Sequence, residues 1–316
     1  MKLAVASLAL AAALLTSCAS MPAAPPRVIA FGDSLTDAGT YARHVQGRTA
    51  GKFTTNPGPL WIEVVAQALG TSIGPHRHAG WGEAPVVLGG LDYAEGSARI
   101  AQPRVPMDPA NAGGQSALPV RDQVSTFLAE DGRFEARDLV FFWAGANDIF
   151  VHTFAAPQTP ERGEALMREA ARDLGAEVRR VLAAGAGQVV LLTIDDYGDA
   201  PATLGSPKRP MMSAWTRAFQ AELAASVAGL APVVLVDAGG LLREVRREPA
   251  RFGLTNVIDP ACNLKGLPQE DVLFCDAKAL VAPDAAQTYL YADDVHPTAA
   301  GQRLIAQAVL RALRVK

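Results

Sequence analysis

Short apolar runs with the composition of β-strands alternate with stretches that have helical spacing, and this alternation limits how the chain can fold. The expected strands are residues 27–33, 138–143, 188–194 and 232–237. The expected helices are residues 59–69, 119–130, 161–184, 211–230, 239–248 and 297–313. The strands are almost continuously apolar, which is typical of a parallel sheet buried on both faces. We therefore predict an α/β fold, a three-layer α/β/α sandwich around a central parallel sheet.

Two long stretches, 71–118 and 249–295, are rich in Gly and Pro and predict irregular structure. Loops of this length in a compact α/β domain usually carry function. The sequence contains no internal repeat and no change of composition that marks a second domain. We expect one folded domain over residues 27–316.

The composition argues against two classes of protein. The chain has 316 residues, is 49% hydrophobic and carries a formal net charge of -3. It contains no block of Lys and Arg, so nucleic acid is not an expected partner. No stretch reaches the roughly 18–20 apolar residues that a membrane-spanning helix needs.

The N-terminus has the pattern of a bacterial export signal. Met1 and Lys2 precede an apolar run from Leu3 to Leu15, which is too short to span a bilayer. The sequence LTSC (15–18) resembles the cleavage site of bacterial lipoproteins, whose Cys becomes the lipidated first residue. We expect a signal peptide over 1–17, lipidation of Cys18 and a tether over 18–26, with the protein held on the outer membrane of a Gram-negative host. Ordinary cleavage and release to the periplasm or medium is the alternative.

Cys262 and Cys275 are the only cysteines after Cys18. In an exported chain this pair predicts one disulfide. Two thiolates are too few for a structural zinc site. The only close histidine pair, HRH (76–78), has no Cys, Asp or Glu beside it, so we interpret it as a solvated loop and expect no metal site.

Candidate catalytic groups follow two of the expected strands. Ser34 follows the strand at 27–33, and Asn147 follows the strand at 138–143. In open α/β sheets, binding sites lie beyond the carboxyl ends of the strands. Ser34 fits a nucleophile and equally a helix N-cap, because Ser is a common N-cap residue.

A serine nucleophile needs a base, and the base needs a group that orients it. His296 fits the base, because Pro297 favours the first position of a helix and restricts the residue before it. Asp293 can share a face with His296, whereas Asp294 cannot, so Asp293 is the favoured orienting group. The structural alternative makes both aspartates helix-end charges and His296 a cap.

Four short motifs, in this order, resemble those of the SGNH, or GDSL, family of serine esterases and lipases. They are FGDSLTDAG (31–39), DYAEGSA (92–98), GAND (145–148) and DDVHPT (293–298). GKFTTNPGPLW (51–61) is similar to a segment of the family's lipase-like branch. The resemblance runs from about Val28 to Leu313 and implies a flavodoxin-like SGNH hydrolase fold. Some relatives carry a C-terminal β-barrel, which we do not expect here because only 20 residues follow His296.

The resemblance also implies a mechanism. Ser34, His296 and Asp293 would form a catalytic triad, and the oxyanion would be bound by the backbone N–H groups of Ser34 and Gly96 and by the side chain of Asn147. The second motif departs from the usual Gly-Gly or Asn-x-Gly of the family, because Ser97 follows Gly96. The one G-x-S-x-G in the sequence, GTSIG (70–74), follows an expected helix and not a strand, so the nucleophile elbow of α/β-hydrolases is not expected.

We therefore expect an extracytoplasmic hydrolase of carboxylic esters that needs no metal or organic cofactor. Its expected partners are small-molecule or lipid esters and a membrane surface, and we expect a monomer. An acyltransferase or lysophospholipase would use the same site, and a non-catalytic acyl-binding lipoprotein is a further alternative. The aromatic residues Phe53, Trp61, Trp81 and Phe150 are candidates for an acyl pocket, although such residues more often belong to the core.

Overall fold

A parallel sheet of four strands forms the centre of the computed structural model, which describes residues 25–45, 49–106 and 114–315. The strands are β1 (Val28–Gly32), β4 (Leu139–Trp143), β5 (Gln188–Leu192) and β6 (Val233–Val236). They lie in the order β1-β4-β5-β6, and every pairing in this sheet is parallel. The four predicted strands and the α/β class are confirmed.

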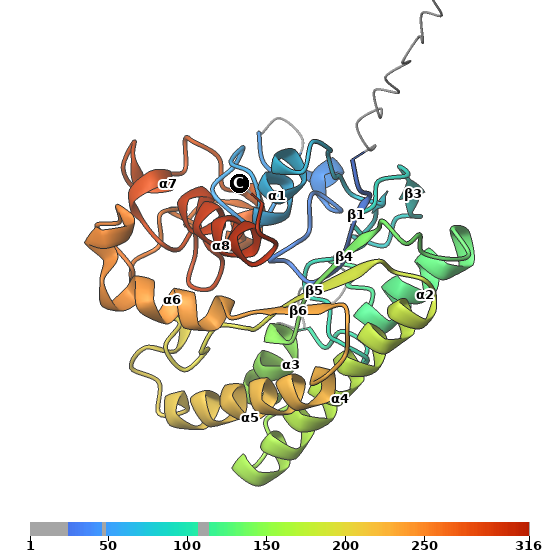
Figure 1. Cartoon of the computed structure of the whole chain (residues 1–316). Helices are drawn as coiled ribbons and strands as arrows, with labels where there is room; N and C mark the ends of the chain where they lie inside the picture. The colour runs from blue at the N-terminus through green and yellow to red at the C-terminus, as the bar shows by residue number, and fades with distance from the viewer. Residues whose placement is uncertain (1–24, 46–48, 107–113, 316) are drawn as a thin grey trace, which may run out of the picture.

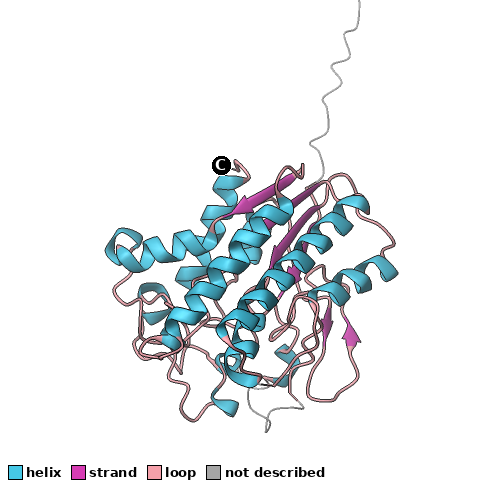
Figure 2. Ribbon diagram, turned by 90° about the horizontal axis from the view of Figure 1, so that it is seen from below, coloured by secondary structure: helices cyan, strands magenta, loops and turns pink. Residues whose placement is uncertain are grey.

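Helices cover both faces of this sheet (Figure 1). One layer contains α1 (Trp61–Ala68), α6 (Ala238–Arg247) and α8 (Ala299–Ala312). The other contains α2 (Val120–Glu130), α4 (Pro160–Ala183) and α5 (Arg209–Val227). Seen from below, the strands run between the long helices (Figure 2). All six predicted helices are present, with ends that differ from the prediction by at most three residues.

Short elements connect these layers. They are the helices α3 (Ala146–Phe150) and α7 (Ala285–Thr288), the π-helical turn Val151–Ala155, the antiparallel strands β2 (Arg77–His78) and β3 (Val86–Val87), and the 3-10 turns Ala42–His44, Pro201–Thr203, Pro249–Phe252, Pro268–Glu270 and Val272–Phe274. Most of them lie in the two stretches predicted to be irregular.

Two of the longer helices, α4 and α8, begin where a side chain accepts from one of their free N–H groups. The Thr159 side chain accepts from the N–H of Arg162 at the start of α4, and Pro160 occupies the first turn, where it loses no hydrogen bond. The Thr298 side chain accepts from the N–H of Gly301 at the start of α8. This cap fixes where α8 begins, directly after His296 and Pro297.

The carboxyl end of β1 is held by its neighbours on both sides. A Cβ added at Gly32 would lie 2.4 Å from the carbonyl oxygen of Trp143, so β1 and β4 approach here only because residue 32 is glycine. The side chain of Gln123 on α2 accepts from the N–H of Gly32 at 2.9 Å and donates to its carbonyl at 2.8 Å. The residues that follow Gly32 therefore leave the sheet in a fixed direction.

A disulfide joins Cys262 and Cys275, as the sequence predicts, with Cα atoms 6.1 Å apart. Both cysteines belong to a second apolar cluster that is separate from the main core. Tyr41 and Phe53, which follow β1, lie in the same cluster as Val272 and Leu273 from the bridged loop. The bridged loop thereby packs against the N-terminal part of the domain.

The predicted signal peptide (1–17), Cys18 and most of the tether (18–26) lie outside the described residues. Their export and lipidation therefore stay predictions. In the parts of the chain that the structure does describe, no helix combines the length and the apolar character needed to cross a bilayer.

Candidate active site

Ser34 lies two residues beyond the end of β1 and is 9% exposed. The turn it belongs to is closed by its neighbour: the Asp33 carboxylate accepts from the N–H of Leu35 at 3.0 Å. No helix begins at Ser34, so the N-cap interpretation of this residue is wrong. Its hydroxyl instead contacts the ring of His296, with 2.7 Å between Oγ and Nε2.

Asp293 holds the other side of the His296 ring. The distance from Nδ1 to Asp293 Oδ2 is 2.6 Å, and Oδ1 of the same carboxylate accepts from the backbone N–H groups of Val295 and His296. One carboxylate therefore fixes both the ring and the turn that carries it. Asp294 is exposed and its side chain makes no hydrogen bond to His296, as expected from a spacing of two residues.

Charge and burial shift the pKa values of His296 and Asp293 in opposite directions. Burial lowers the pKa of His296, but the Asp293 charge and the Asp293 hydrogen bond outweigh it, so the pKa lies above 6.5. Burial also raises the pKa of Asp293, and here the charge and hydrogen bonds of His296 prevail, so the carboxyl remains ionised at lower pH than an ordinary Asp. The pair is thus built to stabilise an imidazolium.

Asp33 adds a further buried carboxyl beside the serine. Its side chain is fully buried, and Oδ2 has no hydrogen-bond partner among the described residues. Burial raises its pKa to about 7, against the lowering effect of its Leu35 N–H bond and of His296. Asp33 was not among the predicted site residues, although its place directly before Ser34 is a signal visible in the sequence.

Asn147 approaches Ser34 from the end of β4. Gly145 adopts φ +125°, which lets the chain turn directly from β4 into α3. The Asn147 side chain lines the same pocket as Ser34 and donates one N–H to the carbonyl of Ala98 at 3.0 Å. Its amide carries a second N–H, so a donor remains for a bound group.

Gly96 does not have the position expected of it. Its N–H donates to Asp37 Oδ2 at 2.8 Å, and Gly96 is not among the residues that line the pocket. A Cβ at this position would lie 2.4 Å from the Phe53 ring, so the glycine is required for packing. The prediction that the Gly96 N–H faces the bound oxyanion is therefore wrong for this structure.

Ser97 lines the pocket in its place. It adopts φ +65°, an uncommon conformation for a residue other than glycine. Its N–H donates to no acceptor among the described residues, whereas its hydroxyl donates to Gln115. The departure of the second motif from Gly-Gly was the sequence signal that could have pointed here.

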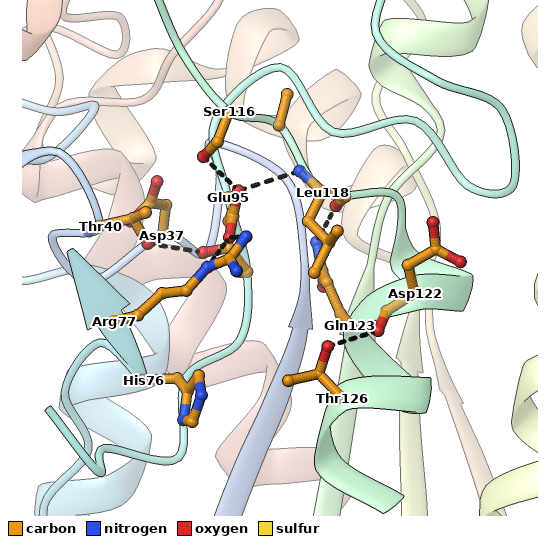
Figure 3. A network of polar contacts seen from close by, with 12 residues as sticks. Asp37, Thr40, His76, Arg77, Glu95, Ser116, Leu118, Asp122, Gln123 and Thr126 are labelled. Atoms are coloured by element: carbon orange, nitrogen blue, oxygen red, sulfur yellow. Dashed lines mark hydrogen bonds and ion pairs between the residues drawn. The ribbon is translucent and has the colours of Figure 1, made fainter. Parts of the chain in front are cut away.

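A buried network holds the loop that carries Gly96 and Ser97 (Figure 3). Glu95 is 2% exposed and receives the Arg77 guanidinium on one oxygen. Its other oxygen accepts from the Ser116 hydroxyl at 2.6 Å and the Leu118 N–H at 2.9 Å. Because every acceptor is used, the loop has little freedom to move away from Ser34.

The HRH segment is not the solvated loop that the sequence predicts. His76 is 4% exposed, stacks on Tyr93 and lies 3.1 Å from the Glu130 carboxylate, while Arg77 belongs to the Glu95 network. Among the described residues, no group of three or more His, Cys, Asp or Glu is arranged to hold a metal ion.

Ser34, Asn147 and His296 share a pocket of about 690 Å³. Phe53 and Phe150 line it, as does Phe154. Trp61 is fully buried against β4 and Trp81 packs on Tyr41 and His44, so these two of the four candidate aromatic residues belong to other clusters. A neighbouring hollow of about 980 Å³ beside the disulfide contains neither the serine nor the histidine.

Comparison with known sequences identifies a protein family. The profile described as GDSL-like Lipase/Acylhydrolase matches residues 28–309. This chain belongs to that family. Within the GDSL family, Esterase EstA of Pseudomonas aeruginosa is 28% identical over 94% of this chain and 48% of its own length.

Two further relatives carry other names. Lipase 1 of Photorhabdus luminescens is 24% identical over 90% of this chain and 49% of its own length. The phosphatidylcholine-sterol acyltransferase of Aeromonas hydrophila is 25% identical over 75% of this chain and 65% of its own length. The chain spans about half the length of EstA and of Lipase 1.

The electrostatics of the pair can be measured directly. We expect the His296 ring to titrate with a pKa above 6.5, and Asp293→Asn to lower that pKa because it removes the opposing negative charge. Histidine ring resonances followed by NMR against pH provide the measurement. Asp284→Asn, an exposed carboxylate outside the pocket, is the matched control. A His296 pKa that does not change in Asp293→Asn would contradict the coupling.

Proposed function

We propose that this protein hydrolyses carboxylic esters with Ser34 as nucleophile, His296 as base and Asp293 as the orienting carboxylate. The observation that carries the proposal is the continuous chain of contacts, 2.7 Å from Ser34 Oγ to His296 Nε2 and 2.6 Å from Nδ1 to Asp293, at the wall of an open pocket. Nucleophile, base and orienting group in this arrangement are what acyl transfer through serine requires.

Each step then has a group to perform it. Ser34 Oγ attacks the ester carbonyl carbon while its proton passes to His296 Nε2. The tetrahedral intermediate collapses, and the leaving alcohol takes the proton from Nε2. Water attacks the acyl-serine in the same way, with His296 accepting and returning a proton, and the carboxylic acid leaves. Asp293 stabilises the imidazolium that exists between these transfers.

For the oxyanion we propose the backbone N–H groups of Ser34 and Ser97 and the side-chain amide of Asn147. Neither backbone N–H donates to an acceptor among the described residues, and all three residues line the pocket. Ser97 replaces Gly96 in this proposal because the Gly96 N–H is held by Asp37. Neutral donors aimed at a developing negative charge stabilise the transition state more than the substrate.

Acyl transfer to an alcohol is a second candidate, favoured by the similarity to a relative named as an acyltransferase. It uses the same acyl-serine and differs only in which nucleophile attacks it. An open pocket that three phenylalanines line accommodates an apolar acceptor as well as an acyl chain.

We also propose that the protein acts outside the cytoplasm, held on a membrane by a lipidated Cys18. The LTSC sequence after a short apolar run supports this, as does the disulfide, which is typical of oxidising compartments.

Ester hydrolysis is tested with p-nitrophenyl esters from acetate to palmitate. We expect turnover in the parent protein and a loss of about a thousandfold or more in Ser34→Ala, because the nucleophile is removed. Ser226→Ala, a serine of α5 outside the pocket, is the matched control. Addition of a primary alcohol and measurement of the new ester separates hydrolysis from transfer. Equal turnover in Ser34→Ala and the parent would reject Ser34 as nucleophile.

Asn147→Ala tests the oxyanion donors. We expect kcat to fall about 100- to 1000-fold with a much smaller change in KM, because the oxyanion exists only beyond the ground state. Thermal unfolding monitored by circular dichroism controls for the lost bond to Ala98. An unchanged kcat would remove Asn147 from the mechanism.

The proposed anchor is tested by expressing the full chain in a Gram-negative host. We expect the protein in the membrane fraction, with a mature N-terminus at Cys18 whose mass is raised by acyl chains. Cys18→Ala should abolish the acylation. Soluble protein that starts at Ala19 or later would indicate ordinary secretion instead.

A further inference from the structure

Four carboxylates line the pocket that contains Ser34: Glu270, Asp271, Asp293 and Asp294. Among the described residues, no Lys or Arg lines it, and its one basic group is His296. Carboxylates that share a cavity repel one another, and each raises the others' proton affinity. A molecule that binds in this pocket must therefore be compatible with its negative charge.

Only one of the four carboxylates forms a hydrogen bond with His296. Asp293 faces the His296 ring. Asp271 accepts from the N–H of Leu273 at 2.9 Å and from the Gln115 amide at 3.4 Å, and neither donor carries a charge. Glu270 and Asp294 are exposed at the pocket and form no ion pair with any residue that the structure describes. Three carboxylates thus remain without an ion-pair partner among the described residues.

Several cations lie outside the wall of this pocket and form no ion pair with its carboxylates. Lys208 lies 4.9 Å from the centre of the Phe154 ring and donates to the carbonyl of Thr153, but it is not part of the pocket wall. Lys265 and Lys278 line the neighbouring hollow, whose wall Glu270 shares, but neither forms an ion pair with Glu270. Arg99 is 6% exposed and is bound to Asp148.

We propose that this pocket selects esters that carry no negative charge near the reacting carbonyl, and that Glu270 and Asp294 provide much of this selection. The inference rests on the proposed ester hydrolysis and names the charge class of its substrates: neutral or cationic esters. An anionic acyl or alcohol group would approach carboxylates in a pocket that is only partly open to water, where repulsion is stronger than in bulk solvent. A neutral group meets the aromatic side chains without that cost.

The same charge pattern affects the product. Hydrolysis converts a neutral ester into a carboxylate at the place where it is least favoured. Repulsion from Asp271 and the two exposed carboxylates then favours departure of the acid over its retention. A neutral substrate therefore enters without opposition, and its acid product is expelled.

Two isosteric pairs of esters test the proposal. Monomethyl glutarate and methyl glutaramate differ only in a terminal carboxylate against a carboxamide. Butyrylcholine and 3,3-dimethylbutyl butyrate differ only in a cationic nitrogen against a carbon. At pH 8 and low salt we expect kcat/KM for the anionic ester to lie at least about tenfold below that of its carboxamide, the effect of about 1.4 kcal/mol of net repulsion. The choline ester should be hydrolysed at least as well as its neutral analogue.

The double variant Glu270→Gln/Asp294→Asn assigns the effect. It should raise kcat/KM for monomethyl glutarate several-fold and change that for methyl glutaramate much less. The control Glu161→Gln/Glu169→Gln removes two carboxylates of α4 that lie outside the pocket and should change neither value. Raising the salt concentration from about 0.02 M to about 0.5 M should reduce the discrimination in the parent, because screening acts on charges exposed to solvent.

Equal kcat/KM for the anionic ester and its carboxamide in the parent at low salt would overturn the proposal. Discrimination that is identical in the parent and the Glu270/Asp294 variant would overturn it too, because the two side chains would then not be its source. The neutral esters keep this test separate from the proposed function: if Ser34-dependent turnover of p-nitrophenyl esters is absent, the ester hydrolase proposal fails first and this inference with it.

Discussion

The contact between Ser34 and His296 depends on how residues 54–58, which precede α1, pack against the start of α8, because Ser34 and His296 come from opposite ends of the domain. A Cβ added at Gly58 would lie 2.4 Å from the Ala299 side chain, so the two segments touch directly. The Thr54 hydroxyl donates to the carbonyl of Pro297, and the Thr55 hydroxyl accepts from the N–H of Ala299. These bonds fix the start of α8, and with it the turn that carries His296, relative to the segment that follows β1.

Two buried carboxylates fix the position of the backbone on the other side of Ser34. Asp37 binds the N–H groups of Gly39, Thr40 and Gly96, and Asp92 binds those of Ala38 and Ala94. Burial raises the pKa of both groups, to about 6 for Asp37. A buried charge of this kind is costly. Among the described residues, backbone N–H groups are the only hydrogen-bond donors to these two carboxylates. These hydrogen bonds hold the loop that contains Ser97 in one position.

The sequence predicted the strands and long helices because their apolar periodicity follows directly from burial on a sheet. It also favoured Asp293 over Asp294, because a turn of three residues is a local property. Gly96 was misassigned for the opposite reason: whether its N–H faces the pocket depends on Asp37, which is 59 residues away in the chain. His76 was misread in the same way, because its partners Tyr93 and Glu130 are brought to it only by the fold.

The negative potential of the carboxylates around His296 affects both the base and the substrate. Asp293, Asp271 and Asp33 all favour the protonated form of His296, which is the form that appears during each proton transfer. This stabilisation of the imidazolium has a limit, because His296 must be neutral to accept the proton from Ser34. Every carboxylate that stabilises the imidazolium also raises the pH above which the neutral form of His296 prevails. Asp33 has one carboxyl oxygen without a hydrogen-bond partner among the described residues, and its pKa is raised to about 7. Its negative charge is therefore lost when the pH falls below about 7. The negative potential that assists the base is thus the same potential that an anionic ester would have to approach.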